Sequence, residues 1–256
     1  MADALLQVTG LSKRFGGIVA TDDLSLSIRQ GELHAVIGPN GAGKTTLVAQ
    51  LAGQLAHDAG RIEFNGDDIG VLPMYRRSQL GLARSFQITS LFLDLSVFDN
   101  VLLAVQAHAG HSFGMWRPAR HEPELRDPAL AALDRVGLSA RAALPASALS
   151  HGEHRLLELA MALAGRPRML LLDEPMAGLG PEESARMVEM LRALKSELTI
   201  LLVEHDMEAV FALADRITVL VYGRVIASGS PQEIRANAQV REAYLGEAEV
   251  AGAGYG

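Results

Sequence analysis

A glycine-rich motif constrains the fold of this chain more than any other feature. Residues 38–45, Gly-Pro-Asn-Gly-Ala-Gly-Lys-Thr, fit the pattern G-x-x-x-x-G-K-[ST]. A nearly all-apolar stretch at residues 34–37 precedes the motif and favours a buried strand, and residues 44–52 favour a helix. Such a loop lets several backbone N–H groups converge on one point, to which the helix adds its positive end. The motif therefore predicts an α/β fold with a phosphate-binding loop.

A second motif supplies acids that a phosphate site needs. Lys44 offers a charge to the β- and γ-phosphates, and the Thr45 hydroxyl is placed to ligate Mg²⁺. Asp173 follows four apolar residues, 169–172, at the end of a predicted buried strand, where open α/β sheets bind ligands. Glu174 comes next and can face an attacking water. The two acids could instead cap a following helix, but Pro175 argues against a helix that starts there.

In the rest of the chain, strand and helix patterns alternate, except in one segment that has no strand pattern. We expect half-buried strands at residues 6–8 and 24–28, and a hairpin at 61–64 with the turn Asn65-Gly66. Buried strands are expected at 169–172, 199–203 and 217–222, with helices from 181 and over 207–214. Between them, residues 88–148 lose the strand pattern, with helices over 97–105 and 129–136. This order predicts a mainly parallel sheet with a helical insertion.

Composition narrows the class of function. The 256 residues suffice for one large α/β domain, and the absence of cysteine excludes disulfides and Cys-type zinc sites. A net charge of −7 argues against nucleic acid as a partner. No apolar run reaches the ~18 residues of a membrane span, and the N-terminus has no signal-peptide pattern. We therefore expect a soluble chain that reaches a membrane only through a partner, and a disordered tail at 247–256.

Taken together, the motifs resemble those of the ABC ATPase family over residues 5–246. In chain order they are Phe15, the phosphate loop, Gln87, Leu149-Ser150-His151-Gly152-Glu153, Asp173-Glu174 and His205. The resemblance implies a P-loop NTPase of the ABC ATPase type: a mainly parallel sheet core, an N-terminal antiparallel β region and a helical insertion. It implies one domain at 1–246: core and β region at 1–87 and 149–235, helical subdomain at 88–148, and C-terminal helices at 231–246.

The resemblance also implies a role for each motif residue. Phe15 would stack on adenine, Gln87 would contact Mg²⁺ and the attacking water, and His205 would hold the γ-phosphate, although an isolated Phe or His is often a core residue. The catalytic set is then Glu174, His205, Gln87 and Lys44, and the Mg²⁺ ligands are Thr45, Gln87 and Asp173. The implied ATP-binding residues are Phe15, Gly38, Pro39, Asn40, Gly41, Ala42, Gly43, Lys44, Thr45, Thr46, Ser150 and Gly152.

Ser150 and Gly152 belong to a segment that the family usually writes as LSGGQ, and that contacts the nucleotide held by a second subunit. Here His151 and Glu153 depart from the pattern. His151 is either a plain spacer or a titrating group that makes activity sensitive to pH. A further departure is Gly180, which stands where the family usually has an Asp and puts that loop's hydrogen bonds across the dimer in doubt.

Within the family, three stretches resemble the branched-chain amino-acid uptake group: residues 91–101, 203–207 and 240–246. This implies the ATPase of an importer for hydrophobic amino acids, with ATP and Mg²⁺ as cofactors and a peripheral place on the cytoplasmic face of the inner membrane. Implied partners are membrane-spanning permease subunits, a second ATPase subunit, identical or sister, and indirectly a periplasmic solute-binding protein. Alternatives are urea uptake, lipopolysaccharide export, an ABC ATPase of DNA repair or translation, and a non-hydrolysing regulator.

An apolar set after Gln87 suggests where a membrane partner docks. We expect that part of it lines a groove for a short helix of the permease, the alternative being that the whole set is core. The set is Leu91, Phe92, Leu95, Val97 and Phe98.

Overall fold

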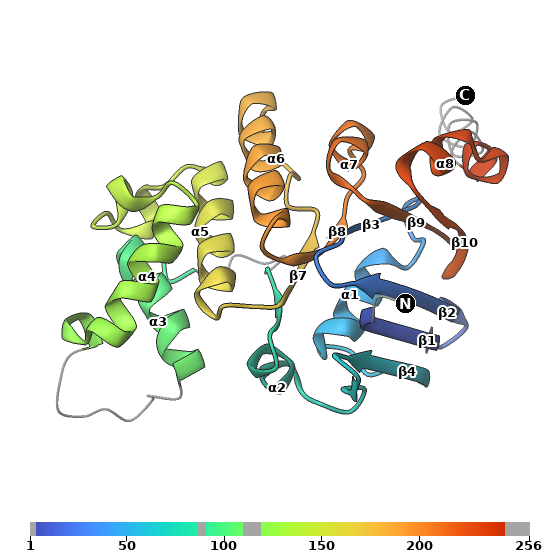
Figure 1. Ribbon diagram of the computed structural model, residues 1–256, viewed down its shortest axis with the longest axis horizontal. Helices are drawn as coiled ribbons and strands as arrows, with labels where there is room; N and C mark the ends of the chain where they lie inside the picture. Colours follow the sequence, from blue (N-terminus) through green and yellow to red (C-terminus); the bar gives the residue numbers. More distant parts are fainter. Residues whose placement is uncertain (1–3, 86–90, 110–118, 244–256) are drawn as a thin grey trace.

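Two β-sheets form the centre of the molecule (Figure 1). The computed structural model describes residues 4–85, 91–109 and 119–243. The four-stranded sheet has the order β2-β1-β4-β5 with antiparallel neighbours, and consists of β1 (Ala4–Phe15), β2 (Ile18–Arg29), β4 (Ala59–Phe64) and β5 (Asp67–Asp68).

The six-stranded sheet has the order β10-β9-β3-β8-β7-β6. Its neighbours pair in parallel except at the edge, where β10 runs antiparallel to β9. The strands are β3 (Leu33–Ile37), β6 (Leu82–Arg84), β7 (Met169–Asp173), β8 (Thr199–Val203), β9 (Arg216–Val221) and β10 (Arg224–Gly229). This sheet confirms the parallel core expected from the alternating pattern.

The parallel strands are mostly apolar because both of their faces are covered. Met169 and Leu171 pack in a core shared with the antiparallel sheet and α1 (Lys44–Ala52). Leu170 and Leu172 face a second core, to which most of the other helices contribute. All residues of β3, β7 and β8 are buried, as expected for strands between two layers.

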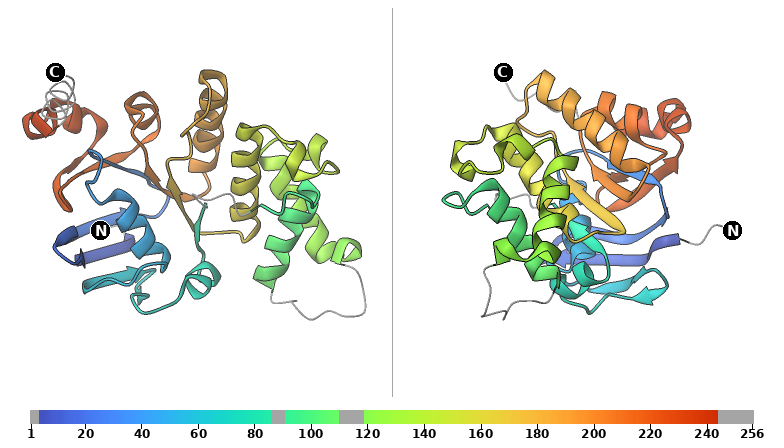
Figure 2. Two further views of the ribbon diagram at one scale, coloured as in Figure 1. Left: turned by 180° about the vertical axis from the view of Figure 1, so that it is seen from behind. Right: turned by 60° about the vertical axis from the view of Figure 1, so that its left-hand side comes forward.

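Three helices gather at one end of the molecule, beside the parallel sheet (Figures 1 and 2). They are α3 (Val97–Ala109), α4 (Pro123–Arg135) and α5 (His151–Ala164), joined by the short turns η1 (Ala119–His121), η2 (Ser139–Arg141) and η3 (Ala146–Ala148). The other helices are α2 (Met74–Gln79), α6 (Pro181–Lys195), α7 (Met207–Leu213) and α8 (Pro231–Ala236). No helix in the described ranges is long and apolar enough to cross a bilayer.

The structure extends several of the expected elements. β1 and β2 have 12 residues each, longer than the short strands expected, because register shifts in their pairing interrupt the simple alternation. Helix α4 begins at Pro123 rather than at residue 129. Pro128 lies inside the helix, and because proline is rare in helix interiors, the sequence pattern did not indicate the first turns. The Asn65-Gly66 turn does join β4 to β5, with positive φ at both residues.

Candidate functional site

The candidate site lies where three neighbouring parallel strands end. The phosphate loop follows β3, Asp173 ends β7, and His205 follows β8 by two residues. Since β8 lies between β3 and β7 in the sheet, the carboxyl ends of all three strands meet at one edge. The fold thus brings the phosphate loop, Asp173-Glu174 and His205 together, as open α/β sheets do at their ligand sites.

Close backbone packing requires glycine at two positions of the phosphate loop. A Cβ on Gly38 would lie 2.1 Å from the carbonyl oxygen of Leu220, and one on Gly43 would lie 2.1 Å from that of Ala20. Gly43 also has a φ of 99°, which L side chains rarely adopt. The loop is therefore wedged between β2 and β9, and its curvature is fixed by neighbouring backbone.

Lys44 begins α1 and folds back over the loop. Its ammonium donates to the carbonyl oxygens of Gly38 at 2.6 Å and Pro39 at 3.0 Å, and the residue is buried. Thr45 in the next position is exposed, and Thr46 is half-buried. Among the other loop residues Ala42 is buried, Pro39 is half-buried, and Asn40 and Gly41 are exposed.

Asp173 is held by an ion pair that the sequence did not reveal. Its Oδ2 accepts from Arg84 Nη2 at 3.0 Å, and the Asp173 side chain is fully buried. Oδ1 has no hydrogen-bond partner among the described residues. Burial raises the pKa of the Asp173 carboxyl, an effect that Arg84 opposes. One oxygen is thus anchored by a cation, and the other is left for a ligand.

Glu174 has an uncommon backbone conformation for a residue with a side chain. Its φ is 51°, and its N–H donates to the carbonyl oxygen of Val203 at 2.8 Å. Non-glycine residues in the left-handed region store strain and cluster at functional sites. Because this bond joins the end of β7 to the end of β8, the backbone of Glu174 is fixed relative to the segment that carries His205.

Glu204 is a second residue that the motifs missed. It is almost completely buried and accepts from the N–H of Met176 at 2.9 Å and from the N–H of His205 at 3.1 Å. Burial raises the pKa of its carboxyl. The His205 side chain itself is 65% exposed, which excludes the core alternative for this histidine. Glu204 therefore links the loop after Glu174 to the backbone of His205; the only sequence signal was an acid directly after a buried strand.

Phe15 lies at the turn between β1 and β2 and is 48% exposed. The Lys13 ammonium lies 5.6 Å from the centre of its ring. The exposure excludes the alternative that Phe15 is a core residue. Its partner across the turn, Ile18, is two residues from Ala20, whose carbonyl borders Gly43 of the phosphate loop. The turn with Phe15 thus lies close to the loop in the fold.

Ser150 and Gly152 lie at the start of α5, and their described contacts are to α5 and α6 rather than to the phosphate loop. Ser150 caps α5: its Oγ accepts from the N–H of Glu153 at 3.2 Å, and its own N–H donates to Glu153 Oε2 at 2.9 Å. A Cβ on Gly152 would lie 2.4 Å from Glu183 Oε1 of α6. The departure at Glu153 thus completes a capping box.

The other two departures also have neighbours within the chain. His151 lies against the loop after Glu174, since a Cβ on Gly178 would be 3.2 Å from His151 Nε2. Gly180 precedes α6, and its N–H donates to Glu183 Oε2 at 3.3 Å. Gln87 lies outside the described residues.

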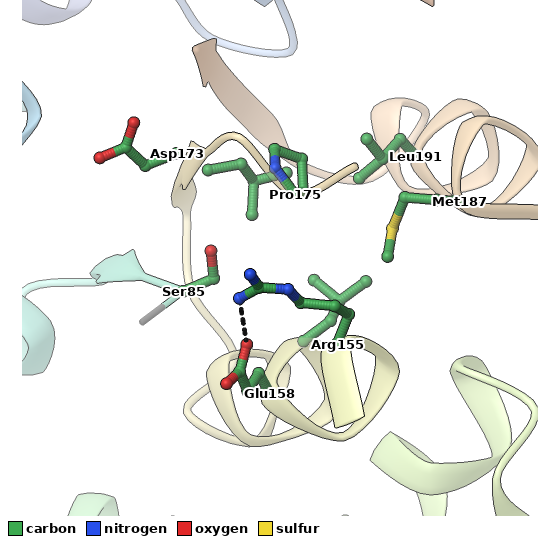
Figure 3. Close-up of a pocket in the computed structure, with 9 residues that line it drawn as sticks. Ser85, Arg155, Glu158, Asp173, Pro175, Met187 and Leu191 are labelled. Atoms are coloured by element: carbon green, nitrogen blue, oxygen red, sulfur yellow. Dashed lines mark hydrogen bonds and ion pairs between the residues drawn. The ribbon is translucent and has the colours of Figure 1, made fainter. Parts of the chain in front are cut away.

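A small cavity near Asp173 lies between the end of β7, α5 and α6, next to Ser85 (Figure 3). Its volume of about 10 Å³ is the size of one water molecule. From α5, Arg155 Nη1 donates to Glu158 Oε2 at 3.1 Å, and both side chains face Ser85 at the end of β6 (Figure 3). Burial raises the pKa of Glu158. The Asp173 carboxylate points away from Arg155 in this view.

A larger apolar groove of about 320 Å³ separates α2 and β6 from α3 and α5. Of the apolar set expected at such a groove, Phe92 lines it and is 56% exposed. Val97 is fully buried in the core and does not line the groove, so only part of the set lies at this surface. The lining residues include Met74, Tyr75, Ser78, Arg84, Phe92, Leu103, Ala107, His108 and Met161.

Comparisons with known proteins agree with this geometry. Residues 21–177 match the family model described as ABC transporter, and residues 224–250 match that of the branched-chain amino acid ATP-binding cassette transporter. The chain is 39% identical to the high-affinity branched-chain amino acid transport ATP-binding protein BraF of Pseudomonas aeruginosa, over 97% of this chain and 100% of that protein. It is 41% identical to the corresponding LivG protein of Salmonella typhimurium over the same shares.

Solved structures show the same fold. A nucleotide-free ATP-binding cassette from an ABC transporter superposes with a TM-score of 0.84 at 29% identity, covering 94% of this chain and 99% of that one. The ADP conformation of such a cassette gives 0.84 at 28% identity, covering 95% and 99%. With the fold, the strand-end site and full-length relatives in agreement, the chain belongs to the ATP-binding proteins of the ABC transporter family.

Proposed function

We propose that this chain is the ATP-hydrolysing subunit of an importer for branched-chain or other hydrophobic amino acids. The names of its relatives and the match at residues 224–250 support this substrate class. The observation that carries the proposed hydrolysis is the meeting of Lys44, Asp173, Glu174 and His205 at adjoining strand ends. Cation, carboxylates and imidazole are the groups that phosphoryl transfer to water requires.

The residues present fit a magnesium ion. Asp173 Oδ1 is a buried carboxylate oxygen without a hydrogen-bond partner among the described residues, and oxygen is the ligand atom that Mg²⁺ prefers. We assign Thr45 and Asp173, together with Gln87, as the residues that would hold the ion. When bound, Mg²⁺ neutralises charge on the phosphates.

The remaining residues have distinct roles in this proposal. The loop backbone from Gly38 to Gly43 and the first turn of α1, including Thr46, cradle the phosphates, and Lys44 adds a full charge. Glu174 polarises the attacking water, with Gln87 beside it, and His205 stabilises the charge that develops on the γ-phosphate. Phe15 offers an exposed ring on which adenine stacks.

The active site is completed by a second ATPase subunit, identical or sister, in a head-to-tail dimer. In this arrangement Ser150 and Gly152 of one subunit contact the nucleotide on the other. The N-terminus of α5 suits this role because the positive end of the helix dipole attracts a phosphate. Loss of the γ-phosphate then reopens the dimer, because ATP binds the closed state better than the open one.

The groove lined by Phe92 is the proposed contact with the membrane. Its wall exposes Met74, Tyr75 and Leu103, an apolar surface suited to a short helix of a permease subunit. The chain would then lie at the cytoplasmic face of the inner membrane, and a periplasmic binding protein would deliver the solute to the permease from the other side.

The substitution Glu174→Gln tests the catalytic part of the proposal. It keeps the shape of the side chain but removes the carboxylate that polarises water. We expect phosphate release to fall by at least about 100-fold, while ATP binding persists and an ATP-dependent dimer accumulates. Phosphate release and size-exclusion chromatography with light scattering measure these outcomes.

Lys44→Ala is the matched control, since it removes a phosphate-binding charge from the same site. We expect this variant to lose both ATP affinity and the dimer, as measured by binding of a fluorescent ATP analogue. Normal hydrolysis by Glu174→Gln would contradict the assigned role, as would unchanged nucleotide affinity in Lys44→Ala.

A further inference from the structure

Arg84 makes the most buried ion pair near the site, and none of the motifs accounts for it. Only 6% of its side chain is exposed, and the carboxylate that it contacts, Asp173, is fully buried. Its second guanidinium nitrogen, Nη1, donates to Gln54 Oε1, just after the C-terminus of α1. The guanidinium is thus fixed between the helix that follows the phosphate loop and the end of β7.

The position of Arg84 in the sheet explains how it reaches Asp173. Arg84 ends β6, and it pairs in register with Leu171 of β7, two residues before Asp173. The same residue lines the apolar groove, as do Phe92 and Leu103. Arg84 therefore reaches from the wall of the groove to the carboxylate at the strand end.

The two oxygens of Asp173 are used differently. Arg84 holds Oδ2, while Oδ1 has no hydrogen-bond partner among the described residues. A carboxylate held at one oxygen by a buried cation rotates less freely, so its other oxygen is kept near one direction. Partners of this kind orient metal ligands in many metal sites.

We propose that Arg84 is the positioning residue that holds Asp173 with Oδ1 directed at the magnesium site. This inference rests on the proposed role of Asp173 as a magnesium-anchoring acid. It goes beyond that role by assigning the preorganisation of the acid to a residue outside the sequence motifs.

A purely compensating role for Arg84 makes the opposite prediction. If Arg84 only neutralised a buried negative charge, its removal would take a positive charge away from the cation site. Divalent cations would then bind equally well or more tightly. A positioning role predicts weaker binding, because the freed carboxylate can rotate away. The sign of the change in cation affinity therefore distinguishes the two roles.

The test measures the affinity of the full chain for Mn²⁺ in the presence of a non-hydrolysable ATP analogue. Mn²⁺ replaces Mg²⁺ and is visible by electron paramagnetic resonance. We expect Arg84→Gln to weaken Mn²⁺ binding by about 10-fold or more, the range found for partners of metal ligands. Arg84→Lys, which keeps a cation beside Oδ2, should recover most of this loss. The matched control is Arg155→Gln. Arg155 is also a partly buried cation near Asp173, but it pairs with Glu158 (Figure 3). The Mn²⁺ affinity of this variant should therefore stay within about twofold of that of the unsubstituted protein.

Equal or tighter Mn²⁺ binding in Arg84→Gln overturns the inference. Asp173→Asn separates this failure from failure of the proposed function: if Asp173→Asn binds Mn²⁺ normally, the magnesium role of Asp173 is wrong. If it binds weakly while Arg84→Gln is unchanged, only the role of Arg84 is wrong. If Arg84→Gln does not fold, Gln54→Ala can be used instead, because it removes the other partner of the guanidinium. We expect Gln54→Ala to lose less Mn²⁺ affinity than Arg84→Gln. An unchanged Mn²⁺ affinity in Gln54→Ala overturns the inference.

Discussion

At the scale of single residues, the shape of the phosphate loop depends on glycines, which have no Cβ atom. Gly43 combines a φ of 99° with a carbonyl oxygen 2.1 Å from where a Cβ would lie. Gly41 has a φ of 78° but open space around the same position. The two glycines therefore separate the cost of a left-handed conformation from the cost of a steric clash with fixed backbone.

We predict that Gly43→Ala lowers the free energy of unfolding by about 2–5 kcal/mol, because a conformational cost of about 1–2 kcal/mol adds to an overlap cost of about 1–3 kcal/mol. Gly41→Ala should show only the first, about 1–2 kcal/mol. Urea unfolding measures both variants. Equal losses in the two would show that the contact with Ala20 imposes no cost.

Residues with a fixed motif were predictable from the sequence, and residues that act through tertiary contacts were not. The approach of Lys44, Asp173 and His205 follows from the order of strands, because buried strands with polar ends gather their ends at one edge. Arg84 and Glu204 have no such pattern. Their partners, Asp173 and Met176, are 89 and 28 residues away in the chain, and only the folded sheet brings them into contact.

At the scale of elements, α5 shows why one departure from the family pattern is tolerated. Glu153 accepts from the N–H of Ser150 and also from Arg141 Nε at 3.0 Å. A glutamine, the usual family residue, would keep the first bond through its amide oxygen. The carboxylate adds a charge that suits a helix N-terminus.

We predict that Glu153→Gln costs about 0.5 kcal/mol of stability, from the lost charge at the helix end and the lost pair with Arg141. Glu153→Ala should cost about 1.5 kcal/mol, because it also removes half of the capping box. Urea unfolding again gives the values. The idea fails if alanine is tolerated as well as glutamine.

Elements were predicted best where an apolar run marked them. The strands β3, β7 and β8 are apolar over nearly their whole length, and their expected positions are confirmed. Helix α2 and strands β6 and β10 were not expected. β6 has three residues and β10 is half-buried at the edge of the sheet, so neither has enough apolar positions for a pattern to appear. α2 has six residues and is held by buried Arg77 rather than by an apolar face.

At the scale of the whole molecule, the groove and the strand-end site share one side chain. Arg84 borders the groove and contacts Asp173, so an occupant of the groove that displaces the guanidinium also frees the carboxylate. The linkage is reciprocal: if groove occupancy weakens the cation site, then a bound cation weakens occupancy by the same factor. The described structure thus contains a direct connection between the proposed membrane contact and the proposed magnesium site.

A label in the groove tests this connection, and the absence of native cysteine makes the labelling specific. In Ala107→Cys the thiol lies in the groove wall, and reaction with N-phenylmaleimide fills part of the groove that Arg84 also lines. We predict a loss of Mn²⁺ affinity of about 2- to 30-fold, which corresponds to a coupling of about 0.5–2 kcal/mol. The same label on Leu130→Cys, an exposed position of α4 away from the groove, should have no effect. In the Arg84→Gln background the label at residue 107 should change nothing further, since the connecting side chain is gone; an undiminished effect there would show that the coupling takes another route.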